Sequence, residues 1–167
     1  PFHASVSAEV VGDSVEEMLE MADDYIEIGP NITIKVPLTP EGLKVCKDLS
    51  TDDVAVNVTL CFSTAQAILA AKAGATYVSP FVGRVNDQSF DGIKLIEEIS
   101  DVYATHKQKT QVLAASIRDV YQVASCFRVG ADICTIPSKI FSGMYKHILT
   151  DQGIAKFDED WTKLVGG

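Results

Sequence analysis

Basic residues are scarce in this chain of 167 residues, which has 14 Lys and Arg against 23 Asp and Glu and a formal net charge of −9. Nucleic-acid grooves and polybasic membrane surfaces need clustered positive charge, so neither partner is expected. Long apolar runs are also missing, because none approaches the roughly 20 residues of a membrane-spanning helix. The first residues do not lead into an apolar signal core. We therefore expect a cytoplasmic protein without a membrane segment.

Cysteines at metal-binding spacing are missing too. Cys46, Cys61, Cys126 and Cys134 form no CxxC motif and have no histidine at ligand spacing. Neither a zinc site nor a disulfide framework is indicated, and no GxGxxG or GxxxxGK[ST] motif marks a nucleotide site. We expect four reduced thiols, at least three of them buried, and no metal or cofactor.

The composition, with 47% hydrophobic and 22% charged residues, is that of one globular domain over residues 1–167. Short β-branched runs predict six strands. They are Ser5–Val10, Asn31–Val36, Val54–Cys61, Thr76–Val82, Gln111–Ile117 and Ile133–Ile136. Each is followed by a predicted amphipathic helix, and the helices are Val15–Tyr25, Pro40–Leu49, Thr64–Ala73, Phe90–His106, Asp119–Val129 and Ser138–Leu149, with a seventh at Gly153–Leu164.

Strict alternation of strands and helices predicts parallel strands with right-handed crossovers. A doubly wound sheet and a TIM (β/α)₈ barrel both satisfy this pattern, and the lack of a nucleotide motif favours the barrel. A barrel needs eight βα units, and this α/β chain supplies six plus a C-terminal helix. We therefore expect a partial barrel whose flanking strands, Ser5–Val10 and Ile133–Ile136, are open to pairing.

Alternation within the strands predicts one polar face, since successive side chains point to opposite sides. In Asn31–Val36, for example, Thr33 and Lys35 oppose the apolar Ile32, Ile34 and Val36. The helix-facing side of a barrel is apolar, so the polar side is the interior. The other interior residues are Ser7, Glu9, Asn57, Thr59, Ser79, Phe81, Ser116 and Arg118, whereas Val56, Val58 and Leu60 are expected in the core.

Lys35 is the strongest catalytic candidate, because it is the only lysine that alternation places on the interior face of a strand. Burial there would disfavour its ammonium form and leave a nucleophilic amine, which can form a Schiff base with a carbonyl substrate. The alternative is a lysine at a strand end that reaches solvent.

Glu9 and Thr59 lie on the strands before and after Lys35 and share its face. Together they could hold a water and move protons during imine formation. Alternatively, Glu9 only neutralises Lys35, and Thr59 is an ordinary strand hydroxyl.

Arg84 and Arg118 follow strand ends near Ser79 and Ser116, where barrels commonly bind phosphate. The alternative is a pair of rim arginines that bridge to Asp87 or Asp119.

Three segments together resemble the core motifs of the transaldolase family, and of its small branch that includes the fructose-6-phosphate aldolases. They are Ile32–Gly42 (ITIKVPLTPEG), Val56–Ser63 (VNVTLCFS) and Val78–Arg84 (VSPFVGR), and Ile154–Trp161 resembles the C-terminal helix of the branch. The resemblance implies transfer of a dihydroxyacetone unit between sugar phosphates in the pentose phosphate pathway. Lys35 would be the Schiff-base lysine, Glu9 and Thr59 would hold the catalytic water, and Arg84 with Ser116, Ser79 and Arg118 would bind the sugar phosphate.

Two positions favour transfer over simple cleavage. Transaldolases resemble this chain in having Glu at Glu9 and Phe at Phe81, whereas fructose-6-phosphate aldolases have Gln and Tyr there. Without a phenol at position 81, protonation of the enamine is less assisted. The bound three-carbon enamine therefore persists long enough to react with an aldehyde acceptor. A lyase that releases dihydroxyacetone and a non-catalytic module that pairs through its edges remain the alternatives.

The resemblance also implies two further βα units ahead of Ser5, with an Asp on the first strand for C–C cleavage and an Asn in a Thr-Asn-Pro segment after the second. The chain shows neither, so we expect an N-terminally truncated member with low activity alone. A fragment, a split gene product, an incomplete reading of a longer gene and a naturally shortened relative all fit. The ring-shaped assemblies of the branch imply a homo-oligomer in which the Phe157/Trp161 helix packs on a neighbouring subunit.

Overall fold

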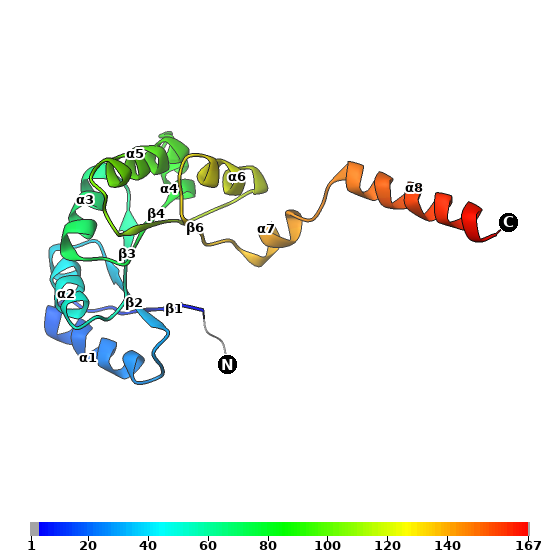
Figure 1. Cartoon of the computed structure of the whole chain (residues 1–167). Helices are drawn as coiled ribbons and strands as arrows, with labels where there is room; N and C mark the ends of the chain where they lie inside the picture. The colour runs from blue at the N-terminus through cyan, green and yellow to red at the C-terminus, as the bar shows by residue number, and fades with distance from the viewer. Residues whose placement is uncertain (1–3, 167) are drawn as a thin grey trace.

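Six parallel strands form one curved sheet in the computed structural model, which describes residues 4–166 (Figure 1). Their order in the sheet is their order in the chain, as a barrel segment requires. The strands are β1 (Val6–Glu9), β2 (Ile32–Pro37), β3 (Val56–Cys61), β4 (Tyr77–Pro80), β5 (Gln111–Ala114) and β6 (Ile133–Cys134). The molecule is thus a curled half-barrel, and within its described residues β1 and β6 are the predicted edges.

The helices follow the strands in sequence, and all but the last two cover the convex face of the sheet (Figure 1). They are α1 (Val15–Ile26), α2 (Pro40–Thr51), α3 (Thr64–Ala73), α4 (Val82–Asp87), α5 (Gly92–Thr105), α6 (Val120–Arg128), α7 (Ser138–Gly143) and α8 (Ile148–Val165). Side-chain oxygens of Ser14, Thr39, Ser63 and Asp119 accept hydrogen bonds from backbone N–H groups in the first turns of α1, α2, α3 and α6. Such caps stabilise a helix by about 1 kcal/mol each.

The hydrophobic core lies between the sheet and these helices. Ile34 and Val36 of β2 and Val56 and Val58 of β3 are fully buried there. Burying a side chain of this size contributes about 1.5–3 kcal/mol. The opposite, concave face carries the polar residues that alternation predicts, and no helix of the described chain covers it (Figure 1).

Several predicted boundaries are wrong. Strands β5 and β6 end at Ala114 and Cys134, so Ser116 and Arg118 lie in the loop after β5. The short helix α4 was not predicted, and α5 begins at Gly92 instead of Phe90. The helix predicted over Ser138–Leu149 ends at Gly143, and the last helix starts at Ile148.

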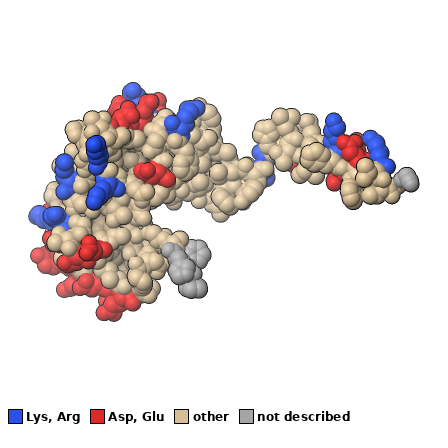
Figure 2. All heavy atoms as spheres, in the orientation of Figure 1, with Lys and Arg blue, Asp and Glu red and all other residues tan. Residues whose placement is uncertain are grey.

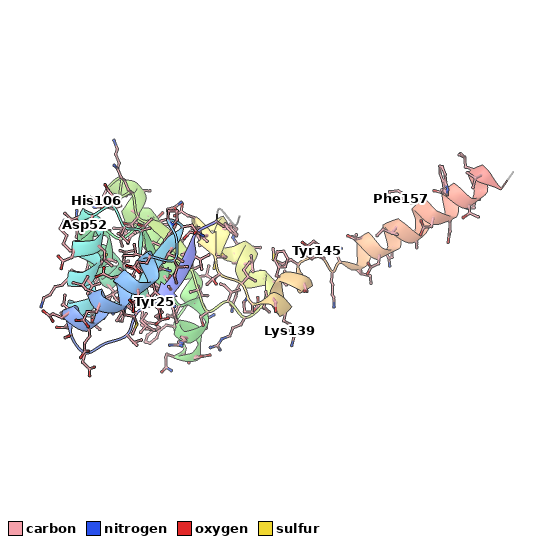
Figure 3. The ribbon with its side chains drawn as sticks, turned by 90° about the horizontal axis from the view of Figure 1, so that it is seen from below. Tyr25, Asp52, His106, Lys139, Tyr145 and Phe157 are labelled. Carbon is pink, nitrogen blue, oxygen red and sulfur yellow. The ribbon has the colours of Figure 1, made fainter. Side chains whose placement is uncertain are left out.

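Helix α8 extends away from the half-barrel (Figure 1) and buries none of its residues. Phe157 stands on it far from the other helices (Figure 3). Ile154, Phe157, Trp161 and Leu164 are exposed at spacings that put them on one face. Residues 4–166 contain no helix long and apolar enough to span a bilayer.

Acidic side chains gather over the lower left of the half-barrel (Figure 2), where α1 carries Glu16, Glu17 and Glu20. Lysines and acidic residues alternate along α8 in the same view. Much of the excess negative charge of the chain therefore lies on the outer helix α1.

Candidate active site

Lys35 and Glu9 meet on the concave face. Strands β1 and β2 pair in register, so these two residues are direct neighbours. The Nζ atom of Lys35 donates a hydrogen bond to Oε2 of Glu9 at 2.7 Å. The Lys35 side chain is 25% exposed and that of Glu9 is 47% exposed, so Lys35 keeps more contact with solvent than its strand pattern predicts.

Three hydrogen-bonded polar residues, Ser7, Asn57 and Ser79, lie beside this pair. The Ser79 hydroxyl donates to Oδ1 of Asn57 at 2.7 Å, and the Asn57 amide donates to the Ser7 hydroxyl at 3.3 Å. Asn57 and Ser79 are both buried. These bonds connect β1, β3 and β4 across the interior and hold the side chains in fixed positions.

Thr59 has a buried hydroxyl that no described residue satisfies. Its side chain is 1% exposed, and Oγ1 has no hydrogen-bond partner in the part of the chain that the structure describes. A buried hydroxyl without a partner is unfavourable by about 1–3 kcal/mol. Thr59 is therefore suited to bond a water or a substrate atom in this cavity.

A β-bulge in β3 positions Thr59. The register with β4 shifts between Val58 and Cys61, and Leu60 adopts a left-handed backbone with φ 59°. The bulge leaves Thr59 on the interior while Cys61 is fully buried. The predicted core position of Leu60 is wrong, because the bulge interrupts the alternation and leaves Leu60 partly exposed.

These side chains line one cavity of about 310 Å³. The lining residues are Ser7, Glu9, Lys35, Asn57, Thr59, Ser79, Phe81, Leu113, Ala115, Ser116 and Thr135. All the predicted interior residues except Thr33 and Arg118 are among them. Thr135 was not predicted as a lining residue. The available signal was its position, since it is a polar residue directly after the Ile133–Cys134 strand.

Arg84 and Arg118 line a second hollow of about 580 Å³, with Phe62, Val85, Asp87, Gln88 and Phe90. Arg118 makes a two-pronged ion pair with Asp87, which was one of the predicted alternatives. The Arg84 guanidinium carbon lies 4.8 Å from the centre of the Phe81 ring. Phe81 also packs edge-on against Phe62, with ring centres 5.7 Å apart. The Phe81 ring therefore adjoins both the cavity and the hollow.

Three cysteines are buried and Cys134 is partly buried, as predicted. Burial raises the pKa of Cys46 and of Cys61 to about 12. The Cys126 thiol donates to the sulfur of Cys134, which raises the pKa of Cys126 and lowers that of Cys134. Among residues 4–166, no cluster of three His, Cys, Asp or Glu side chains could hold a metal ion.

Residues 2–167 match the sequence profile of the family described as transaldolase/fructose-6-phosphate aldolase. The chain belongs to this family. It is 51% identical to a probable transaldolase of Paracoccus denitrificans over 95% of its own length and 73% of that protein. The corresponding protein of Cereibacter sphaeroides is 53% identical, with 95% and 72% covered. That of Caulobacter vibrioides is 46% identical, with 93% and 72% covered.

A crystal structure of mandelate oxidase shares the fold with a TM-score of 0.60 at 16% identity. The match covers 79% of this chain and 49% of the oxidase. At this identity the likeness concerns the fold alone. Membership of the transaldolase/fructose-6-phosphate aldolase family indicates an enzyme with transaldolase- or aldolase-type activity.

Proposed function

We propose that this family member is a transaldolase that carries a dihydroxyacetone unit on Lys35 as a Schiff base. The observation that carries the proposal is the Lys35–Glu9 pair, at 2.7 Å, in a cavity that the unpartnered Thr59 hydroxyl also lines. An amine, a carboxylate and a free hydroxyl are the groups that imine formation needs. The name "Probable transaldolase" of the relatives supports the same activity.

The reaction begins when the Lys35 amine, having lost a proton to Glu9, attacks the carbonyl carbon of a ketose phosphate. The carbinolamine hydroxyl takes a proton from Glu9 and leaves as water, which gives a protonated imine. The hydroxyl on the fourth carbon gives its proton to solvent water, the bond between the third and fourth carbons breaks, its electron pair stays on the three-carbon unit as an enamine, and an aldose phosphate departs. The enamine attacks the aldehyde of an acceptor, whose oxygen takes a proton from solvent water, and hydrolysis of the imine releases the new ketose and restores the amine.

Each of the other residues has a role in this scheme. Thr59 holds the water that enters and leaves, while Asn57 and Ser79 fix the donor hydroxyls. Glu9 is the only carboxylate among the described cavity residues, and it serves the imine steps.

A lyase of the fructose-6-phosphate aldolase type is the second candidate within the family. Phe81 argues against it, because its ring lies in the cavity between Phe62 and Arg84 and offers no phenol to protonate the enamine. With a donor and an acceptor present, product analysis distinguishes the two activities. Transfer yields a new ketose phosphate, whereas cleavage yields free dihydroxyacetone.

We further propose that the protein is a homo-oligomer in which α8 packs on a second copy of the chain. The support is the apolar face of α8, which includes Phe157 and Trp161 and is not buried by any of residues 4–166. Burial of such a face on another surface is favourable by about 25 cal/mol per Å². Sheet edges β1 and β6 are further candidates for pairing.

Borohydride trapping tests the Schiff base directly. Incubation with fructose 6-phosphate and sodium borohydride, followed by peptide mass mapping, should place the reduced adduct on Lys35. Lys35→Met should abolish the adduct, while Lys44→Met on the outer helix α2 should leave it intact. An adduct found only on another lysine would contradict the proposal that Lys35 forms the Schiff base.

A further inference from the structure

The guanidinium of Arg118 is held at its end by one carboxylate. Nη1 and Nη2 donate to Oδ1 and Oδ2 of Asp87, and both side chains are about half exposed. A two-pronged pair of this kind fixes the plane and direction of the guanidinium. Two of its five N–H groups are used, so three remain for another anion.

The Nε atom of Arg118 lies close to the first turn of α4. This atom is 2.6 Å from the place where a side chain on Gly83 would begin, so only glycine leaves room for it there. The Gly83 N–H donates to the Ser116 carbonyl at 3.1 Å, which ties the loop after β5 to the same turn. Gly83 and Asp87 therefore confine the Arg118 side chain between them.

Arg84, three residues before Asp87 on α4, lines the same hollow as Arg118. Among residues 4–166, no carboxylate forms an ion pair with Arg84. The hollow thus contains two guanidinium groups, of which Asp87 engages only one. The Phe81 ring connects this hollow to the Lys35 cavity.

We propose that Asp87 is a positioning residue for phosphate recognition: it holds Arg118 so that the free N–H groups of Arg118, with Arg84, face the phosphate of a sugar phosphate. The proposal rests on the proposed function, since a phosphorylated donor places its phosphate away from the carbonyl at Lys35. The lowered pKa of Asp87, caused by its hydrogen bonds to Arg118, supports a carboxylate that stays ionised throughout the neutral range.

The first test measures binding of inorganic phosphate to the 167-residue chain by calorimetry. Asp87→Ala should lower the affinity roughly tenfold, because Arg118 loses the two-pronged bond that fixes the direction of its guanidinium. Asp101→Asn, on the outer face of α5, removes one exposed carboxylate and should have no effect. Asp87→Glu retains a carboxylate and should recover part of the affinity. Unchanged or tighter phosphate binding by Asp87→Ala would overturn the proposal.

The second test compares donors. Asp87→Ala should raise KM for fructose 6-phosphate with little change in kcat, and should leave imine trapping of unphosphorylated dihydroxyacetone at Lys35 within about twofold. In an Arg118→Ala background, Asp87→Ala should add nothing, because the two residues act as a unit. Equal losses for both donors, or an undiminished effect without Arg118, would contradict the role. Failure to trap either donor would instead count against the Schiff base, and phosphate binding would still decide the role of Asp87.

Discussion

The Nζ atom of Lys35 lies 2.7 Å from Oε2 of Glu9 because β1 and β2 pair these two residues in register. The carboxylate is therefore placed to take a proton from the amine before attack and to return it to the departing hydroxyl. A partly exposed ion pair of this kind adds only about 0–1 kcal/mol to stability. Its position in the cavity is consequently better explained by chemistry than by folding.

Glu9→Gln should slow imine formation by about a hundredfold or more, since positioned acid–base groups contribute roughly 10² to 10⁴. Borohydride quenching at short times would measure the rate. Glu20→Gln, on the exposed side of α1, is the matched control and should behave as the wild type. An unchanged rate would mean that Glu9 only neutralises Lys35.

Lys107→Gly should stabilise the protein. Lys107 follows α5 with a left-handed backbone of φ 50° and an exposed side chain, a conformation that costs non-glycine residues about 1–2 kcal/mol. Part of this gain is lost to the greater freedom of glycine in the unfolded chain. We expect a net gain of about 0.5 kcal/mol, and a rise in Tm of about 1–2 °C. Lys109→Gly, where φ is not positive, should not raise Tm.

Thiol alkylation should be selective and depend on pH. A lowered pKa favours the thiolate, so Cys134 should react before the other thiols as pH rises. Cys46 and Cys61, with pKa raised to about 12 by burial, should stay protonated and unmodified in the folded protein. Mass mapping after a short iodoacetamide pulse would show the order. Preferential labelling of Cys46 or Cys61 would contradict the burial of these thiols.

Phe157→Ser should shift the protein to smaller species in sedimentation velocity. It removes one of the two aromatic rings, the other being Trp161, from the exposed apolar face of α8. Lys156→Ser, on another side of that helix, should leave the distribution unchanged. At protein concentrations too low for association, the melting of the half-barrel should be the same in both variants, since α8 buries no residue of its own. A single species of constant size in all three proteins would argue against α8 as the interface.

The parts of the fold that follow from local pattern were predictable from the sequence. Strand alternation placed Lys35, Glu9 and Asn57 on one face, because each strand is regular there and its partner is the next strand along the chain. Ser and Thr caps likewise marked the starts of α1, α2 and α3. These signals need no knowledge of tertiary contacts.

The missed features depend on contacts between distant residues. The bulge at Leu60 gives a leucine a left-handed backbone, which local propensity does not anticipate. Helix α4 has six residues including Gly83, too few for a periodic signal, and its close contact with the Ser116 loop is made with the next βα unit. The Asp87–Arg118 pair joins residues 31 apart. The sequence alone therefore left both Asp87 and Asp119 as possible ion-pair partners of the rim arginines.

The single tryptophan of the chain, Trp161, is on α8 and 65% exposed, far from the sheet. Its fluorescence therefore reports on the surroundings of α8 and not on the packing of the half-barrel. In the dissociated chain, unfolding of the sheet should leave the emission spectrum nearly unchanged and must be followed by circular dichroism. Conversely, a blue shift of the Trp161 emission with rising protein concentration would show that α8 packs against an apolar surface of another chain.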